Sequence, residues 1–475
     1  MKRFTIFVLL VSILLTGSTT YANSGPTFWE GYPSSEILVI DEDSPISVEK
    51  EELLFDFTNE EVKDLGGYNL ASLVTASYTM NNTSVRHQSV QMAFPLISRI
   101  RDFNPNHIKI EVDGESIPYQ VFIGDLVNQG SKKDGDSNEW DFSAIVNSIS
   151  SSPYIPQNYK LDDMGMLYTY SIGPSGDEEI NIEISYRYDK NKTKVISKGF
   201  NGYQFSEDNG IVNKSLTTWV RENEPLEIFV LGQDIDLKIT AYTNGEKTEE
   251  TDDYSLDTNT KELAIGDYLS KEIEAYSNDI AYKDYIADNQ ISNQIIKLID
   301  RLVEDRQINL ELSEIFSLDE SDRFFVLIYD VEFDPQAIRE VGVSYISRGT
   351  MERVKTSNPT HTFDYILNPA ANWASFKDLN IEVRVPSDYP YIIDSSLDFA
   401  RKEDGTYQAS FASLPEEDLY FTLYHKESLS LLDKIKGTLR NGQDAFKGII
   451  PFGVGLLVGF LVRRNYKKKK SGKTK

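Results

Sequence analysis

The sequence predicts a mainly β protein with two antiparallel β-sandwich-like modules, an α-helical insertion and a C-terminal transmembrane helix. Apolar residues alternate with a period of two over most of the chain, which is typical of half-buried strands. Turn signals such as Asp113-Gly114 and Asn244-Gly245 separate these runs. The aromatic content of 12%, with 27 Tyr and 24 Phe, suits sheet faces.

The first residues, 1–22, are expected to form a signal peptide. Two basic residues, Lys2 and Arg3, precede a short apolar run, and Ala22 is a small residue at the expected cleavage position. The mature chain would then begin near Asn23, and a retained N-terminal anchor is the alternative. Because the chain has no cysteine, a lipoprotein anchor, a disulfide framework, a zinc ribbon and a cysteine nucleophile are excluded.

Residues 23–265 are predicted to form an N-terminal β-sandwich region with a long loop at 126–160. The clearest strand is 180–188, where Ile and Tyr occupy every second position. Residues 108–112 and 117–121 are expected to pair as a hairpin around Asp113-Gly114. Further strands are predicted at 46–57, 72–80, 225–231 and 235–243.

Residues 266–320 are predicted to be a helical insertion or linker, because the hydrophobic period changes there. Ile291, Ile295 and Ile299 lie on one helical face together with Leu302 and Val303. A second β module is expected at 321–427, with strands at 323–333, 341–347, 379–385, 406–411 and 418–424.

The C-terminal end predicts a membrane anchor. An amphipathic juxtamembrane helix is expected at 428–446, a transmembrane helix at 447–463 and a basic cytoplasmic tail at 464–475. The span is short, and the alternative is a buried C-terminal helix followed by a solvated basic tail. Gly455 and Gly459 form a small-residue pair that suits helix–helix contact. The chain would therefore be a single-pass protein of the cell membrane with its bulk outside.

The charge of the expected extracellular part is strongly negative. The whole chain carries −27, while residues 1–22 carry +2 and residues 447–475 carry +9, so that residues 23–446 carry −38. Such a surface repels nucleic acid, which excludes a nucleic-acid-binding role. It suits cationic partners or divalent ions, although solubility alone is a sufficient explanation.

One stretch, 74–121, resembles known families. It has a strand ending at Asn81-Asn82-Thr83, a strand ending at Phe94-Pro95-Leu96, and then the Asp-Gly hairpin. The pattern resembles the β-sandwich of vault/inter-α-trypsin-type domains and an "aFPL" module of exported bacterial proteins of unknown function. In the second family a segment similar to 363–386 often follows, with Tyr365, Leu367 and Trp373 at the matching positions. The resemblance implies a secreted or membrane-anchored β-sandwich and transfers no catalytic residue.

No catalytic, cofactor-binding or metal-binding residue is predicted. Serine hydrolase, zinc protease, Walker and Rossmann motifs are absent from the sequence. The four histidines, at 87, 107, 361 and 425, are far apart in sequence, and no cofactor is expected. One loop, Asp134–Asp141, places Asp134, Asp136, Asn138 and Asp141 at a spacing that calcium could use, but it lacks the EF-hand Gly and Glu. A solvated acidic loop is the simpler interpretation.

These observations favour a non-catalytic interaction or structural component of the cell envelope. Its partners would be the membrane, through the C-terminal helix, and an envelope protein or a second copy of the chain. The alternative is a glycan- or ligand-binding module that uses Trp140, Trp219 and Trp373 as stacking platforms. A hydrolase is a further alternative, since carboxylates can meet in a fold without a sequence motif.

Overall fold

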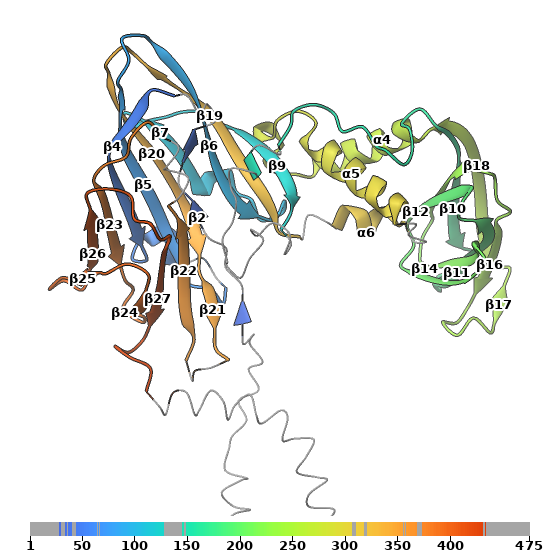
Figure 1. Ribbon diagram of the computed structural model, residues 1–475. Coiled ribbons are helices and arrows are strands. Elements are labelled where there is room, and N and C mark those ends of the chain that lie inside the picture. The colour runs from blue at the N-terminus through green and yellow to red at the C-terminus, as the bar shows by residue number, and fades with distance from the viewer. Residues whose placement is uncertain are drawn as a thin grey trace, which may run out of the picture.

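The structure is a computed structural model. It describes residues 28–29, 34–35, 37–39, 44–63, 65, 67–127, 145–146, 149–305, 310–317, 321–354, 356, 358–367, 373–430 and 433. The protein is mainly β, as the sequence predicts. Figure 1 shows a large β body, a group of helices and a smaller β unit, arranged in that order.

The large body, here the proximal body, is built on an eight-stranded sheet, sheet I. Its strand order is β25-β26-β23-β4-β5-β20-β7-β8. Apolar side chains alternate along these strands, so that one face is buried, as in β5 where every second residue is inaccessible. The strands are β4 (Ile46–Asp56), β5 (Ala71–Asn82), β7 (Ile108–Val112), β8 (Glu115–Ser116), β20 (Ile338–Arg348), β23 (Leu379–Arg384), β25 (Ala400–Arg401) and β26 (Tyr407–Phe411).

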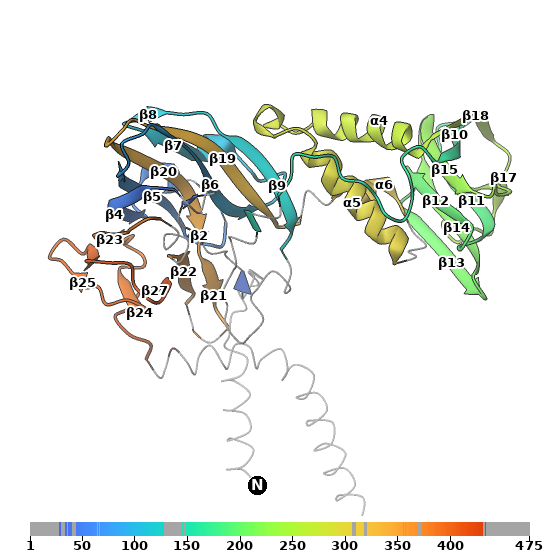
Figure 2. The same ribbon diagram turned by 45° about the horizontal axis from the view of Figure 1, so that its top comes forward.

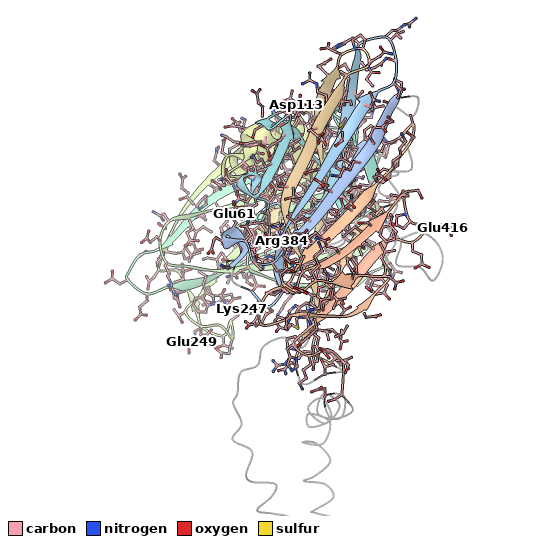
Figure 3. The ribbon with its side chains drawn as sticks, turned by 90° about the vertical axis from the view of Figure 1, so that its left-hand side faces the viewer. Glu61, Asp113, Lys247, Glu249, Arg384 and Glu416 are labelled. Atoms are coloured by element: carbon pink, nitrogen blue, oxygen red, sulfur yellow. The ribbon has the colours of Figure 1, made fainter. Side chains whose placement is uncertain are left out.

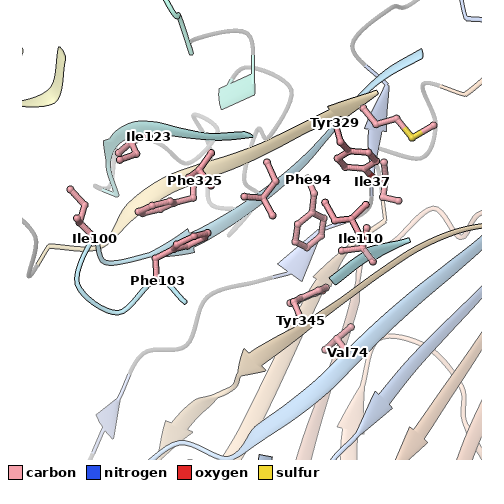
Figure 4. Packing of buried hydrophobic residues seen from close by; sticks show 14 of the residues in the cluster. Ile37, Val74, Phe94, Ile100, Phe103, Ile110, Ile123, Phe325, Tyr329 and Tyr345 are labelled. Atoms are coloured by element: carbon pink, nitrogen blue, oxygen red, sulfur yellow. The ribbon is translucent and has the colours of Figure 1, made fainter. Parts of the chain in front are cut away.

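Two further sheets cover the buried face of sheet I. Phe55 of sheet I packs edge-on against Phe421 of sheet II with ring centroids 5.0 Å apart, and Phe94 of sheet III lies 4.8 Å from Tyr345 (Figure 4). Sheet II contains β1 (Phe28–Trp29), β2 (Ser34–Ser35), β21 (Thr350–Glu352), β22 (Thr360–Ile366), β24 (Tyr391–Ser395) and β27 (Leu419–Tyr424). Sheet III contains β3 (Leu38–Val39), β6 (Gln88–Ser98), β9 (Gln120–Leu126) and β19 (Arg323–Phe333). Short helical turns are α2 (Glu60–Lys63) and η1 (Pro105–His107).

The strand pairing differs from the predicted division into modules at 23–265 and 321–427. β5 pairs with β20 over eleven residue pairs, and β6 pairs with β19 along its whole length. Strands from both predicted modules therefore share sheets I and III and one hydrophobic core. The physical reason is that β9 and β19 are neighbours in sheet III, so that the chain leaves the proximal body at Leu126 and returns beside it at Arg323. Everything between them is an insertion.

The insertion contains a helical layer and a second pair of sheets, here the distal unit (Figure 2). The helices are α4 (Ile265–Asn278), η3 (Lys283–Tyr285), α5 (Gln290–Glu304) and α6 (Leu312–Phe316), within the predicted helical region except at Ile265. The predicted apolar stripe is confirmed, because Ile291, Ile295 and Ile299 are buried. Sheet IV has the order β12-β15-β10-β18 and sheet V the order β13-β14-β11-β16-β17. Their strands are β10 (Met164–Pro174), β11 (Ile180–Asp189), β12 (Thr193–Lys198), β13 (Gly202–Asp208), β14 (Ile211–Val220), β15 (Glu224–Gly232), β16 (Lys238–Tyr242), β17 (Glu250–Thr251) and β18 (Tyr254–Ala264).

Helix α5 attaches the insertion to the proximal body by capping the free edge of β9. The Ile123 N–H donates to Gln290 Oε1 at 3.0 Å, and Gln294 Nε2 donates to the Ile123 carbonyl at 2.7 Å. Lys297 adds an ion pair with Asp125 at 2.6 Å. Since the two glutamines are four residues apart on a helix, they lie one turn apart on the same face. They continue along an edge at which the Val121 carbonyl already accepts a hydrogen bond from the Ala287 N–H at 2.9 Å.

The described part of the predicted loop at 126–160 is held against α5. Asp300 is buried and accepts hydrogen bonds from the N–H groups of Gln157 and Asn158, both at 2.8 Å, and from the Tyr154 hydroxyl at 2.9 Å. Burial by itself would raise the pKa of Asp300, but these hydrogen bonds lower it overall. Asn289, Gln290 and Asn293 bond residues 150–154 in the same way, so that the segment that follows residue 149 is held along α5 by several side chains.

The predicted turn at Asp113-Gly114 is confirmed, with both residues at positive φ between β7 and β8. The predicted pairing of 108–112 with 117–121 is wrong in its second strand, because β7 pairs with Glu115–Ser116 and residues 120–121 begin β9, which pairs with β19. Figure 3 labels Asp113 in the upper part of the proximal body, below the tip of its longest strands. The expected signal peptide, the C-terminal amphipathic, transmembrane and basic segments, and the Asp134–Asp141 loop lie outside the described residues, apart from a few positions at 428–433. No helix in the described ranges is long and apolar enough to cross a membrane.

The capping of β9 gives a stability prediction. In the double variant Gln290→Ala/Gln294→Ala, the N–H and C=O of Ile123 lose their partners, and we expect a loss of about 2–4 kcal/mol in the free energy of unfolding. Urea denaturation measures this loss, and amide hydrogen exchange at Ile123 should accelerate. Ser292→Ala on the same helix is the control and should change stability by less than about 0.5 kcal/mol. Equal effects of the two changes would refute a capping role.

Candidate functional site

The distal unit is a two-sheet sandwich with its own core. Ile182 and Ile184 of β11 face Ile228 and Val230 of β15, and all four are buried in one cluster. The opposite face of sheet IV packs on the helical layer, where Phe229 stacks on Tyr268 of α4 with ring centroids 4.9 Å apart. The part of sheet IV around β15 is therefore covered on both faces, whereas most residues of β18 are exposed. Sheet V is covered on one face only and presents its outer face to solvent.

Strands β13 and β14 form the hairpin at the edge of sheet V. Asn209 and Gly210 connect them with φ values of 51° and 81°, the two positive angles that a tight hairpin turn requires. Within the described ranges β13 pairs with β14 alone, and none of its residues is buried. Tyr203 is 46% exposed and Phe205 52% exposed, and their rings are stacked at 6.3 Å. An edge strand with two exposed aromatic rings is a place where another molecule can bind.

Lys214 lies beside these rings on the same face of sheet V. It is the cross-strand partner of both Tyr186 and Phe205, and its ammonium group is 5.5 Å from the centre of the Tyr203 ring. Burial lowers the pKa of Lys214 to about 8, while the negative charges of Glu311 and Glu314 act in the opposite direction. The Tyr186 hydroxyl is buried and has no hydrogen-bond partner among the described residues. The interior of the sandwich next to this edge therefore contains two polar groups, the Lys214 ammonium group and the Tyr186 hydroxyl.

Glu311 closes the edge of the neighbouring sheet. It lies beside the edge strand β12, where the Ser197 hydroxyl donates to Glu311 Oε2 at 2.5 Å and the Gly199 N–H donates to Oε1 at 3.0 Å. The Ser197 N–H also donates to the Leu310 carbonyl at 2.9 Å. Burial raises the pKa of Glu311 in spite of these bonds. This arrangement gives the edge of β12 a structural partner.

The outer face of sheet V contains a shallow hollow of about 620 Å³. By strand register, Ser185, Ser215 and Gln204 lie in one row across it, and the next row contains Arg187, Asn213 and Ser206. Asp236 completes the polar lining. Tyr186, Lys214 and Phe205 form the row between, and because their side chains point to the inner face they can border the hollow only through their backbone. Hydroxyl, amide, guanidinium and carboxylate groups of this kind can bind a polar ligand by hydrogen bonds.

The tryptophans expected to form stacking platforms do not gather on one face. Trp373 is 5% exposed and belongs to the core of the proximal body, whereas Trp219 lies on sheet V and is 37% exposed. Trp140 is outside the described residues. A platform of several tryptophans therefore has no support in the described ranges. The exposed aromatic residues that sequence reasoning missed are Tyr203 and Phe205, although the Asn209-Gly210 turn beside them was a readable hairpin signal.

The histidines stand apart from one another. His87 is exposed between Glu332 and Asp334, which raise its pKa. His361 is buried against Tyr389 and accepts a hydrogen bond from the Leu70 N–H at 3.3 Å, while His425 contacts Asn358. Within the part of the chain that the structure describes, no three His, Asp or Glu residues are arranged to hold a metal ion.

Comparisons with known proteins assign no family. No protein-family model matches the sequence, and no curated protein matches it. A Legionella pneumophila protein whose crystal structure is described as a "putative nutrient binding protein" is similar at 10% identity and a TM-score of 0.31, over 84% of this chain and 73% of that chain. A similarity of this size carries no argument about fold or function. The resemblance to vault/inter-α-trypsin-type and "aFPL" modules therefore stays a prediction.

The buried His361 gives a pH prediction. Burial lowers its pKa from 6.5 to about 4, so that between these values the unfolded chain binds a proton that the folded chain does not. Stability therefore falls as the pH is lowered through this window. We expect the wild type to lose about 2 kcal/mol more than His361→Gln between pH 7 and pH 5. Urea denaturation at the two pH values measures the difference, and the exposed His107→Gln should behave as wild type. Parallel pH profiles for wild type and His361→Gln would contradict the assignment.

Proposed function

We propose that this protein is a non-catalytic interaction component of a cell envelope, held at the membrane by residues 447–463 with its β-rich bulk outside. The observation that carries the proposal is the exposed β13 edge of the distal unit, with Tyr203 and Phe205 on one of its faces. This edge lies on an insertion that projects from the proximal body (Figure 1). Because the edge of β13 carries aromatic rings and projects from the proximal body, it is accessible to another molecule.

The attachment of the insertion supports this role. Its two ends leave neighbouring strands, and α5 is bonded to β9 through Gln290, Gln294 and Lys297. One hydrophobic cluster also continues from the proximal body through the helical layer to Phe229 of sheet IV. A binding surface held in a fixed orientation loses less entropy when it associates. The distal unit is therefore suited to presenting a preformed surface.

The location of the protein is argued from the sequence. The basic start and short apolar run of residues 1–22 suit export, and the uncharged run before the basic tail suits an anchor whose tail faces the cytoplasm. The charge of −38 on residues 23–446 favours association with cationic partners over anionic surfaces. These features agree with an extracellular interaction role.

Site-specific photo-cross-linking in cells tests the proposal. A photoreactive phenylalanine analogue at Asn213, in the hollow of the distal unit, is expected to give one discrete adduct with another envelope component. The same analogue at the exposed Glu115 of the proximal body is the matched control and should give none. Mass spectrometry identifies the adduct. If Asn213 gives no adduct, or both positions give the same products, the distal unit is not an interaction surface.

A second candidate function is binding of a glycan or another small polar ligand, favoured by the polar lining of the hollow on sheet V. Binding of the full chain to an array of cell-wall glycans tests it. Gln204→Ala/Asn213→Ala should weaken binding by about tenfold or more, because two hydrogen-bonding side chains are lost. Thr258→Ala, on sheet IV, should bind as wild type. Absence of any glycan signal, or equal binding by both variants, would remove this candidate.

A further inference from the structure

No strand among the described residues pairs with the outer edge of β13, which has the geometry of an unfilled strand position. In a hairpin with a two-residue turn, the residues flanking the turn are hydrogen-bonded to each other, and the pairs then alternate along the ladder. Asp208 and Ile211 flank the turn here. The backbone N–H and C=O groups of Tyr203, Phe205 and Glu207 therefore point away from β14. An extended chain beside β13 could bond to all three residues.

The other edges of the insertion differ from that of β13. The edge of β12 is covered by Leu310 and Glu311, and the far end of sheet V is β17, an edge strand of only two residues. β18 is an open edge, but it carries Asp257, Lys261 and Glu262 among polar neighbours. Capping and edge charges are the usual means by which proteins prevent strand pairing. The Gly202–Ser206 part of β13 has neither a charge nor a proline.

The aromatic pair gives the open edge a preferred kind of partner. Tyr203 and Phe205 lie on the same face of β13, so that an added strand would place every second side chain beside their rings. The distal unit between residues 164 and 264 contains 19 Asp and Glu against 10 Lys and Arg. This excess of negative charge attracts a cationic segment and repels a second copy of the same unit.

We propose that β13 is a docking strand for an extended, cationic segment of another protein, which adds to sheet V by β-augmentation. The segment carries aromatic or aliphatic side chains at alternate positions, facing Tyr203 and Phe205, and Lys or Arg at others. Backbone hydrogen bonds supply affinity, and the two rings select the side chains. The inference deepens the proposed interaction function and rests on it.

Peptide selection on the full chain tests the proposal, with a phage-displayed random library of peptides of about twelve residues as the probe. Enriched peptides should alternate apolar residues and carry net positive charge. Phe205→Pro removes an outward N–H and one ring, while it leaves the bonds between β13 and β14 in place. It should weaken the selected peptides by at least about tenfold in fluorescence anisotropy.

Two further variants separate docking from misfolding. Phe205→Thr keeps the N–H and a strand-forming residue, so it should weaken binding less than Phe205→Pro does. Leu256→Thr makes a matched change at the exposed Leu256 of the other open edge, β18, and should leave binding unchanged. The proposal is overturned if no peptide is enriched, if Phe205→Pro binds as wild type, or if the chain instead dimerises through β13 in sedimentation.

The Phe205→Pro variant also tests the docking role of β13 separately from the proposed interaction function. With the photoreactive group at Asn213, Phe205→Pro should abolish the adduct formed in cells. An adduct that persists in Phe205→Pro would leave the interaction function standing and reject β13 as the docking strand. Absence of any adduct in the unmutated chain would reject the interaction function itself.

Discussion

The arrangement of this protein depends on how one exposed strand edge, that of β9, is satisfied. An unpaired edge presents N–H and C=O groups that must find partners, and another strand would be the simplest partner. Here Gln290 and Gln294 of α5 take that position at Ile123. The same contact ends sheet III and attaches the insertion. Packing of α4 and α5 then determines where the distal unit lies relative to the proximal body.

β9 and β13 differ in how their edges are covered, and this difference bears on the function of the distal unit. Both are edge strands, but a helix covers the first, and the second is open with Tyr203 and Phe205 exposed. Because side chains of α5 cover the edge of β9, side chains could cover the edge of β13 in the same way. We therefore interpret the open edge as a functional feature and the capped edges as structural ones. Function would then be concentrated in the insertion, and the proximal body would act as its support.

Much of the secondary structure could be predicted from the sequence, whereas the domain organisation could not. The period of two correctly located strands such as β11, where burial alternates from Ile182 onward, and β19 was located although its first five residues are all buried. The partner of a strand is not encoded in that period. β5 and β20 are separated by about 260 residues, and only the fold shows that they pair. For this reason two linear modules were predicted where one body is interrupted by an insertion.

The strands around the candidate site were the hardest to predict, for identifiable reasons. In β14 the inward position between Val212 and Leu216 is Lys214, a charge that interrupts the apolar alternation. β18 is exposed along one edge and over much of its surface, so that polar residues occupy both of its faces. It therefore lacks the apolar alternation from which a strand is predicted. In β13, Tyr203 and Phe205 occupy alternate positions, as a strand requires. Alternation alone does not show whether the rings are buried or exposed. Sequence therefore indicates where strands lie, and the fold decides which side chains remain available.

The exit of the insertion at one end of two antiparallel neighbours has a mechanical consequence. Val127 and Asp322 are still bonded backbone to backbone where the two connections leave sheet III. A force that pulls the distal unit away along these strands would act on both connections in the same direction, so it would load β9 and β19 together and would not separate them from each other. The ladder between β19 and β6 would bear this load in shear, with its eleven residue pairs loaded together. The side chains of α5 that bond to β9 would share the load.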